Sequence, residues 1–407
     1  MLQGKDIAIG ISGGIAAYKS LYLIRKLVEE GANVWPIMTP NAERFVTPLS
    51  VAVLAGRRPL TNLWSSSESG EVSHVELAHR VTASLIAPTT ADLLSRLAQG
   101  RATDPLTALC LSTPNPVCLA PAMETEMWNA LPTIHNLENL RKRGFKILHP
   151  NNGALASGRE GIGRLPEPDV ILDFFRRAFY PQDLIEKHIL VTAGPTREPI
   201  DPARFLSNPS SGKMGFAIAQ AATERGAHVH LVHGPTLLPT PTNLEEVVKV
   251  NSTQEMLQAC ATRLNKVHTV IMAAAPADFR PAQPSAQKLK KGKSNLKSIA
   301  LTKNPDIIQT LSQQKKGQYM VGFAAESEQL EKYAREKLAQ KGLDLIVAND
   351  ITAPEGGFGS ATNTVLLLNK EGETQMVIDQ PKIAVAHKII DFIQASVKKE
   401  TSLPPTC

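Results

Sequence analysis

Two loops of this 407-residue chain combine serine and glycine with a following helical pattern, an arrangement suited to binding phosphate. The first is Ser12-Gly13-Gly14, after the apolar run Asp6–Ile11, and the second is Ser210-Ser211-Gly212, before the helical pattern Lys213–Arg225. Backbone N–H groups at the start of a helix point toward an anion, and the helix dipole favours its negative charge. An ordinary tight turn explains the first loop equally well from this segment alone, because it lacks the pattern G-x-G-x-x-G.

Lysines form a second group of candidate phosphate-binding residues. The segment Phe279–Pro305 contains seven Lys and Arg residues and no acid. It is either a solvated loop or a mobile lid over phosphates, whereas a nucleic-acid surface would more often interleave Arg with aromatic residues. Lys337 and Lys341 are spaced i,i+4, so they share one face of a predicted helix and can reach one phosphate chain. On its own, such a pair is also typical of a solvated helix face.

The elements that must position these residues alternate between strands and helices. In the first half, strands are predicted at Asp6–Ile11, Asn33–Met38, Ala83–Ala87 and Pro116–Ala120. Such alternation predicts a parallel sheet covered by helices on both faces, with ligands at the carboxyl ends of the strands. Those ends are polar or rich in glycine, at Ser12–Gly14, Met38-Thr39, Pro88–Asp92 and Pro121–Glu124.

The same pattern restarts after the linker-like sequence Tyr180-Pro181-Gln182. Further strands are predicted at His188–Thr192, His228–Val232, Thr269–Ala273, Tyr319–Phe323, Leu343–Ala348 and Thr364–Asn369. Gly194–Gly212 is predicted to be a long loop, and Lys382–Ser396 a closing helix. The sequence therefore predicts an α/β protein with domains at 1–180 and 188–400, a linker at 181–187 and a disordered tail at 401–407.

Composition favours a cytoplasmic protein that acts on small molecules. The net charge of +6 is mild for this length, and no apolar run approaches the ~20 residues of a membrane span. The short apolar stretch Ile7–Ala17 continues directly into a helical pattern, so we interpret it as a strand and a turn and not as a signal peptide. The four cysteines have no metal-ligand spacing, and Cys110 and Cys118 are predicted to be buried thiols of a reduced protein. His228, His230 and His233 alternate along one strand and are predicted to be structural.

Several segments of the first half resemble one known family. They are "GISGGIAAYK" at Gly10–Lys19, Met38-Thr39, "SHVEL" at Ser73–Leu77, "PTTADL" at Pro88–Leu93 and "PAM" at Pro121–Met123. In this order they resemble the flavin-dependent cysteine decarboxylases, above all the flavin half of the bifunctional bacterial phosphopantothenoylcysteine decarboxylase / phosphopantothenate–cysteine ligases. The resemblance implies a flavodoxin-like domain that decarboxylates phosphopantothenoylcysteine to 4′-phosphopantetheine. It further implies an active-site histidine at His74 and FMN bound by Ser12, Gly13, Gly14 and Thr39.

Three residues depart from that family. The family's substrate-binding Asn is Glu124 here, its proton-donating Cys in a mobile flap (Ala154–Gly163) is Ser157, and the Asn of its "AND" motif is Thr103. A carboxylate repels a substrate carboxylate unless it is protonated. A serine hydroxyl is also a much weaker acid than a cysteine thiol, whose ordinary pKa is about 8.5. We therefore predict that this half binds FMN and decarboxylates poorly; the alternative is a degenerate, non-catalytic or regulatory flavin domain.

The second half is similar to the CTP-dependent ligase domain of the same family. The matching strings are "TAGPTREP" at Thr192–Pro199, "RFLSNPSSGKMG" at Arg204–Gly215, "AAAPADFR" at Ala273–Arg280, "KLKK" at Lys288–Lys291, "KNPDI" at Lys303–Ile307, "VGFAAE" at Val321–Glu326 and "LDLIVAND" at Leu343–Asp350. The resemblance implies a Rossmann-like domain that joins 4′-phosphopantothenate to cysteine through an acyl-cytidylate made from CTP. It also implies homo-oligomers, with trimers through the flavin domain and dimers through the ligase domain.

The same resemblance assigns roles to individual residues. Asn208 lies beside the acyl phosphate, and Lys288, in the basic segment, closes over the nucleotide, which favours the lid over the solvated loop. Mg²⁺ is expected because triphosphate chemistry uses it, and Asp278 contacts the nucleotide or this metal. The remaining residues implied to bind the nucleotide are Ala273, Ala274, Ala275, Pro305, Asp306, Ile307, Ile308, Phe323, Lys337 and Lys341. Neither a nucleic acid nor a membrane is expected as a partner.

Overall fold

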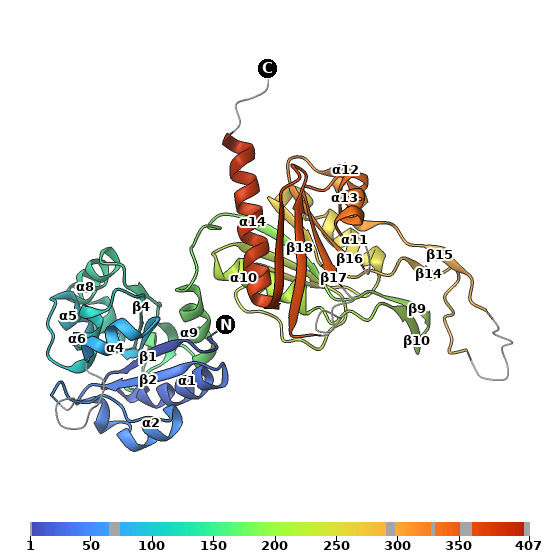
Figure 1. The fold of residues 1–407 in the computed structure, drawn as a ribbon. Coiled ribbons are helices and arrows are strands. Elements are labelled where there is room, and N and C mark those ends of the chain that lie inside the picture. The colour runs from blue at the N-terminus through green and yellow to red at the C-terminus, as the bar shows by residue number, and fades with distance from the viewer. Residues whose placement is uncertain (1, 65–73, 290–297, 327–329, 351–359, 403–407) are drawn as a thin grey trace. The chain divides into compact units, whose positions relative to one another are not determined.

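The computed structural model describes residues 2–64, 74–289, 298–326, 330–350 and 360–402 (Figure 1). The chain divides into two compact units, Met1–Pro181 and Gln182–Cys407. Both are α/β units in which helices pack on a central sheet that is wholly or mostly parallel. This confirms the predicted fold class for each half.

The N-terminal unit is built on a five-stranded parallel sheet. Its strands are β1 (Asp6–Ile11), β2 (Asn33–Met38), β3 (Ala83–Thr89), β4 (Val117–Pro121) and β5 (Lys146–Ile147), in the order β2-β1-β3-β4-β5. This is the strand order of the flavodoxin-like folds, so the predicted flavodoxin-like topology is confirmed. The order reverses between β1 and β3, and a ligand crevice is expected at their carboxyl ends.

Helices cover both faces of this sheet because its strands are apolar on both sides. Ile7, Ile9 and Ile11 of β1 face one core, and Ala8 faces the other. The helices are α1 (Tyr18–Glu29), α2 (Pro48–Ala55), α4 (His74–Arg80), α5 (Ala91–Ala98), α6 (Pro105–Ser112), α7 (Thr125–Asn129), α8 (Leu131–Lys142) and α9 (Pro168–Arg177). A short 3₁₀ helix, η1 (Ile15–Ala17), leads into α1. A two-stranded antiparallel hairpin, β6 (Asn151–Ala154) and β7 (Glu160–Arg164), lies outside the main sheet.

The C-terminal unit has an eight-stranded sheet in the order β12-β11-β8-β13-β16-β17-β18-β19. The strands are β8 (His188–Ala193), β11 (His228–His233), β12 (Glu246–Lys249), β13 (Thr269–Met272), β16 (Tyr319–Glu326), β17 (Leu345–Asp350), β18 (Thr362–Asn369) and β19 (Thr374–Pro381). The first six in this order are parallel and follow the Rossmann arrangement, while β18 and β19 are antiparallel. The predicted Rossmann-like topology is confirmed.

Two apolar cores hold the helices of this unit against the sheet. Val191 of β8 faces the core shared with α10 (Lys213–Glu224) and α14 (Lys382–Ser402). Its neighbour Leu190 faces the opposite core, shared with α11 (Thr253–Ala261) and α12 (Ile307–Gln314). A further helix, α13 (Leu330–Lys341), packs against β17 and β18.

The structure corrects several sequence-based boundaries. Gly194–Gly212 is not simply a loop, because it contains an antiparallel hairpin, β9 (Arg197–Asp201) and β10 (Arg204–Ser207). The Asp201 carboxylate closes its turn by accepting from the backbone N–H groups of Ala203 and Arg204, both at 2.8 Å. Helix α14 continues to Ser402, so the first two residues of the predicted tail are helical, and residues 403–407 lie outside the described residues.

The basic segment Phe279–Pro305 begins and ends in paired strands, β14 (Phe279–Pro281) and β15 (Leu301–Lys303). Residues 290–297 between them, including Lys290 and Lys291 of the "KLKK" string, lie outside the described residues. Within the part of the chain that the structure describes, no helix is both long and apolar enough to cross a membrane.

Candidate functional site

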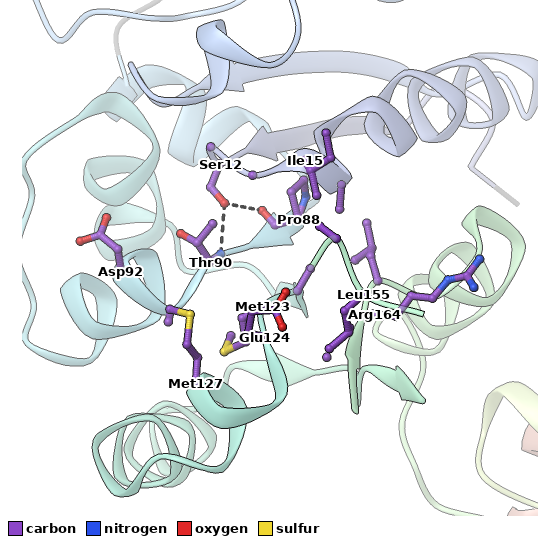
Figure 2. Close-up of a pocket in the computed structure, with 18 of the residues that line it drawn as sticks. Ser12, Ile15, Pro88, Thr90, Asp92, Met123, Glu124, Met127, Leu155 and Arg164 are labelled. Atoms are coloured by element: carbon purple, nitrogen blue, oxygen red, sulfur yellow. Dashed lines mark hydrogen bonds between the residues drawn. The ribbon is translucent and has the colours of Figure 1, made fainter. Parts of the chain in front are cut away.

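The first candidate site is a cavity of about 660 Å³ in the N-terminal unit, at the carboxyl ends of β1, β3 and β4. Small-ligand sites usually measure about 300–1,000 Å³. Figure 2 shows Ser12, Pro88 and Thr90 grouped at the strand ends, with Met123, Glu124 and Leu155 across from them. The cavity therefore lies at the crevice that the strand order predicts.

Hydrogen bonds fix the strand ends on the polar side of this cavity. The Ser12 hydroxyl donates to the carbonyl of Pro88 (2.7 Å) and accepts from the backbone N–H of Thr90 (3.1 Å). A Cβ atom at Gly13 would lie 2.4 Å from the Cβ of Asn41, so only glycine fits there. The turn leads directly into η1 and α1, which places backbone N–H groups at a helix start beside the cavity. These features fit the phosphate of a flavin mononucleotide.

The basic side chains of the cavity are neutralised by carboxylates. The Lys19 ammonium donates to Glu167 (2.8 Å) and to the carbonyl of Leu165 (3.0 Å), and this hydrogen bond lowers the pKa of the Glu167 carboxyl below its ordinary value. Arg96 pairs with Asp92 (3.0 Å) and also with Asp104. The cavity thus offers few free positive charges to an acidic ligand.

The structure brings together most of the residues predicted for this half. Ser12, Gly13, Gly14 and Thr39 all line the cavity, as does Glu124. The hydroxyl of Ser157 donates to the Glu124 carboxylate at 2.9 Å, so two of the three departures are in direct contact. The third, Thr103, accepts a hydrogen bond from Arg96 (3.0 Å). The predicted active-site histidine, His74, is the first residue of α4 and is not among the lining residues.

Sequence reasoning missed several lining residues of the first cavity. These are Tyr18, Lys19, Asn41, Arg96, Met127 and Arg164. Thr90 also lines the cavity, within the predicted strand end Pro88–Asp92. The thiols cannot replace the missing proton donor, because burial raises the pKa of both Cys110 and Cys118 to about 12. Both are buried free cysteines, as predicted.

The second candidate site is a cavity of about 660 Å³ in the C-terminal unit. It opens at the start of α12, where the backbone N–H groups of a helix terminus favour an anion. Lys337 and Lys341 of α13 both line it, and so does Lys303 of β15. Unlike the first cavity, this one gathers three lysines beside a helix N-terminus.

Asn208 anchors the loop after β10 to the segment that follows β13. Its side-chain amide donates to the carbonyls of Pro276 (3.0 Å) and Ala275 (3.3 Å). Pro276 lines the second cavity, which places Asn208 directly behind the wall of that cavity. The Lys341 ammonium lies 3.0 Å from the carboxylate of Asp306, which also caps α12 by accepting from the backbone of Gln309.

Most of the nucleotide-binding residues predicted for this half line this cavity. They are Ala274, Asp278, Pro305, Asp306, Ile307, Ile308, Phe323, Lys337 and Lys341. Ala273, Ala275 and the loop Ser210–Gly212 are not among its lining residues, although Ala275 contacts Asn208. Lys288 is also outside the lining, and the next residue, Leu289, bonds to Asp201 and Arg204 of the β9–β10 hairpin. Sequence reasoning missed Lys303, Asn304, Phe279 and Gln309.

His188, His228 and His230 form a cluster toward the amino ends of β8 and β11. The ring of His188 stacks on that of His228, with centroids 4.7 Å apart, and lies 5.8 Å from that of His230. His230 in turn bonds to the Glu246 carboxylate at 3.1 Å. Among the described residues, no group of three or more His, Cys, Asp or Glu side chains could hold a metal ion.

Comparisons with known families agree with this architecture. Residues 1–179 match the model of a family described as Flavoprotein. Residues 184–397 match the model described as DNA/pantothenate metabolism flavoprotein C-terminal domain. The chain is therefore a two-part protein that joins a flavoprotein domain to this C-terminal domain.

Full-length relatives define the family more closely. The Coenzyme A biosynthesis bifunctional protein CoaBC of Vibrio vulnificus (strain YJ016) is 43% identical over 395 residues, covering 97% of this chain and 98% of that protein. The protein of the same name from Bacillus subtilis (strain 168) is 40% identical over 404 residues, covering 98% and 99%. A crystal structure of the C-terminal domain of such a protein is 40% identical, covers 53% of this chain and 98% of that one, and has a TM-score of 0.46. The chain belongs to the family of coenzyme A biosynthesis bifunctional proteins.

Proposed function

We propose that the C-terminal unit is a phosphopantothenate–cysteine ligase that uses CTP. The observation that carries this proposal is the second cavity, where Lys337, Lys341 and the N-terminus of α12 converge. Ammonium groups and helix N–H groups are the donors that a triphosphate requires. Asn208, held beside the same cavity, supplies a polar group for the acyl chemistry. The resemblance of the sequence strings to the ligase family identifies the substrates as 4′-phosphopantothenate, CTP and cysteine.

The proposed reaction has two steps. The carboxylate of 4′-phosphopantothenate attacks the α-phosphorus of CTP, the bond to the β-phosphate breaks, and pyrophosphate leaves. The amine of cysteine then attacks the acyl carbon of the acyl-cytidylate, CMP leaves, and the amine loses a proton as the amide forms. From the family resemblance we assign to the Asn208 amide the stabilisation of the oxygen that becomes negative in the second step; in this structure the amide donates to the carbonyls of Ala275 and Pro276. The two lysines hold the phosphates during the first.

Mg²⁺ is the divalent ion that we propose for the triphosphate. It usually keeps several waters and binds to substrate phosphates together with one or two carboxylates. Asp278 and Asp306 line the cavity, so one or both are available as carboxylates beside the phosphates. No carboxylate cage is needed for such a substrate-held ion, which fits the donor set of the described residues.

We further propose that the N-terminal unit binds FMN through Ser12, Gly13, Gly14 and Thr39 and decarboxylates poorly. The cavity volume, the glycine turn before η1 and the match to the flavoprotein family support flavin binding. When bound, the flavin would supply the oxidation that precedes loss of CO₂ in this family. The Ser157 hydroxyl is a weak acid bonded to Glu124, so it is poorly suited to return a proton to carbon or sulfur.

A second candidate function for this unit is a non-catalytic, regulatory flavin-binding domain. The contact between Glu124 and Ser157 favours it, because both side chains replace groups that act on the substrate in the related decarboxylases. His74 and Ser157 remain the proposed catalytic residues if decarboxylation does occur. Flavin binding without turnover of phosphopantothenoylcysteine would favour the regulatory function.

The remaining proposals concern assembly and location. Leu49 and Val53 lie four residues apart on α2 and are 74% and 73% exposed, which supports self-association of the N-terminal unit. Light scattering of the purified chain tests for the homo-oligomer that the family resemblance implies. The substrates and the reduced cysteines are those of a cytoplasmic enzyme.

One assay tests the proposed ligase. The purified chain is supplied with 4′-phosphopantothenate, CTP and Mg²⁺, and release of pyrophosphate and CMP is measured with and without cysteine. We expect CMP release to require cysteine and phosphopantothenate together. Hydrolysis of CTP that is independent of both acceptors would contradict the proposal, and ATP serves as the nucleotide control.

A further inference from the structure

The β6–β7 hairpin closes against the segment that follows β4, beside the first cavity. The backbone N–H of Met123 donates to the carbonyl of Gly163 at 3.0 Å. Near the tip, the Ser157 hydroxyl donates to Glu124 at 2.9 Å. Arg159 pairs with Glu126 at 3.0 Å. Three contacts of different kinds therefore hold the hairpin to one short segment.

Two glycines of β7 make this approach possible. A Cβ atom at Gly163 would lie 2.0 Å from the carbonyl oxygen of Met123, and φ at Gly163 is +144°. At Gly161 it would lie 2.2 Å from the hydroxyl oxygen of Thr125. Larger residues would lift the hairpin away from this segment. The close approach of the hairpin to residues 123–126 therefore depends on the two glycines of β7.

Glu124 differs from the other ionised side chains of the cavity because it has no ion-pair partner among the described residues. Lys19 and Arg164 both pair with Glu167, and Arg96 pairs with Asp92 and Asp104. For Glu124, the structure shows no ion pair within the described ranges, and its hydrogen-bond partner is the neutral hydroxyl of Ser157. The cavity wall beside it carries the apolar side chains of Met123, Met127 and Leu155 (Figure 2). A half-buried carboxylate without an ion-pair partner attracts cations and repels anions.

We propose that Glu124 determines the charge of the ligand accepted beside the flavin, so that the cavity takes an amine with an apolar chain and rejects the matching carboxylate. Ser157 is a positioning residue, because its hydrogen bond holds the Glu124 carboxylate on the cavity wall. The proposal rests on flavin binding by the N-terminal unit. It goes beyond poor decarboxylation, since it assigns this cavity a preferred ligand class.

The test uses the full chain loaded with FMN and three ligands of equal chain length. n-Hexylamine, hexanol and hexanoate are titrated at neutral pH, and the shift in flavin absorbance reports binding. We expect hexylamine to bind on the order of tenfold or more tighter than hexanoate, with hexanol between them. Equal affinities for the amine and the carboxylate, or a preference for hexanoate, would overturn the proposal.

Three variants separate charge selection from a change in structure. Glu124→Gln, compared at equal FMN occupancy, is expected to abolish the amine preference. Ser157→Ala is expected to reduce the preference several-fold, and Ser157→Thr, which keeps a hydroxyl, to restore it. Glu126→Gln, the matched control on the same segment, is expected to retain it. If Glu124→Gln keeps the full preference, Glu124 does not select the ligand.

The same experiment distinguishes the inference from the proposal on which it rests. A chain that takes up no FMN, with flavin absorbance unchanged from free FMN, contradicts flavin binding and with it the charge selection. A chain that takes up FMN and binds the three ligands equally contradicts the charge selection alone.

Discussion

The two cavities of this chain have similar volumes, about 660 Å³ each, and differ in which charged side chains line them and how those side chains are paired. In the N-terminal unit, Lys19, Arg96 and Arg164 are neutralised by carboxylates, and Glu124 has no basic partner among the described residues. In the C-terminal unit, three lysines line the cavity beside a helix N-terminus together with Asp278 and Asp306, and Lys341 pairs with Asp306. Both sites sit on α/β folds, so the fold alone does not decide the chemistry. The difference is local: Glu124 places a carboxylate without an ion-pair partner among the described residues in the first cavity, whereas the second has lysines beside a helix N-terminus.

The largest effect is expected at Asn208. Asn208→Ala removes the amide that the family resemblance assigns to the acyl chemistry, and loss of one catalytic donor commonly costs about 10²–10³ in rate. We expect cysteine-dependent CMP release to fall by that order, with a smaller loss in pyrophosphate formation. Asn251→Ala is the control, because that amide bonds to the Arg197 carbonyl elsewhere in the unit. Equal loss in both half-reactions would assign Asn208 a general binding role instead.

The second prediction concerns a double variant that gives the first cavity the residues of the related decarboxylases at positions 124 and 157. The double variant Glu124→Asn, Ser157→Cys removes the unpaired carboxylate and supplies a more acidic proton donor. A positioned general acid contributes about 10²–10⁴ in rate. We expect release of CO₂ from phosphopantothenoylcysteine to rise at least tenfold over the natural chain, and less in either single variant.

Flavin content and ligase rate serve as controls for this double variant. Both are expected to stay unchanged, because neither residue is placed in the phosphate-binding turn or in the C-terminal unit. Natural protein that already releases CO₂ as fast as the double variant would show that Glu124 and Ser157 do not limit the reaction.

A smaller effect is expected from the lysines of α13. Lys341→Ala removes one ammonium beside the proposed triphosphate and frees Asp306, which then repels it. We expect KM for CTP to rise about tenfold with a smaller change in kcat, corresponding to about 1.4 kcal/mol of binding. Lys332→Ala, at an exposed lysine of the same helix outside the cavity, is expected to leave KM unchanged. An unchanged KM in Lys341→Ala would remove that lysine from the nucleotide site.

The smallest expected effect is on the pH dependence of thermal stability. It arises at the histidine cluster, which lies outside both cavities. Burial, together with repulsion from His228, His230 and His268, lowers the pKa of His188 below its ordinary value of 6.5. The folded chain therefore binds this proton less readily than the unfolded chain, so stability is lost as pH falls through about 6.5. His188→Gln should reduce the drop in Tm between pH 7.5 and pH 5.5 by about 1–2 °C.

Thermal unfolding at the two pH values measures this effect. Glu246, whose pKa is lowered to about 2 chiefly by a hydrogen bond from Arg263, loses its contribution only at lower pH and does not enter this window. A pH dependence that is identical in the natural chain and in His188→Gln would show that this histidine does not contribute.

Much of the fold could be predicted from the sequence because its signals are local. Apolar runs followed by glycine or helical patterns predicted most strands of the two central sheets, and the i,i+4 spacing correctly placed Lys337 and Lys341 on one face. The strand β19 was not predicted, since its two ends carry polar residues that face solvent on an edge strand. The β9–β10 hairpin was missed because the Asp201 side chain, and not a glycine pair, closes its turn.

The sites were harder to predict from the sequence because their residues come from segments that lie far apart in the chain. Glu124 and Ser157 are separated by 33 positions, and nothing in the sequence pattern places the one against the other. The family resemblance marked each as a departure, whereas only the folded hairpin reveals that they form one hydrogen-bonded pair. Lys303 was likewise missed as a cavity residue, since its position depends on the pairing of β15 with β14.

One measurement tests the contrast between the two units most directly. The purified chain, loaded with FMN, is given 4′-phosphopantothenate, CTP, cysteine and Mg²⁺, and the products are followed over time by mass spectrometry. We expect phosphopantothenoylcysteine to accumulate with stoichiometric CMP and pyrophosphate, while 4′-phosphopantetheine forms far more slowly. Conversion to 4′-phosphopantetheine at the rate of the ligase step, without accumulation of the intermediate, would contradict this account of the N-terminal cavity.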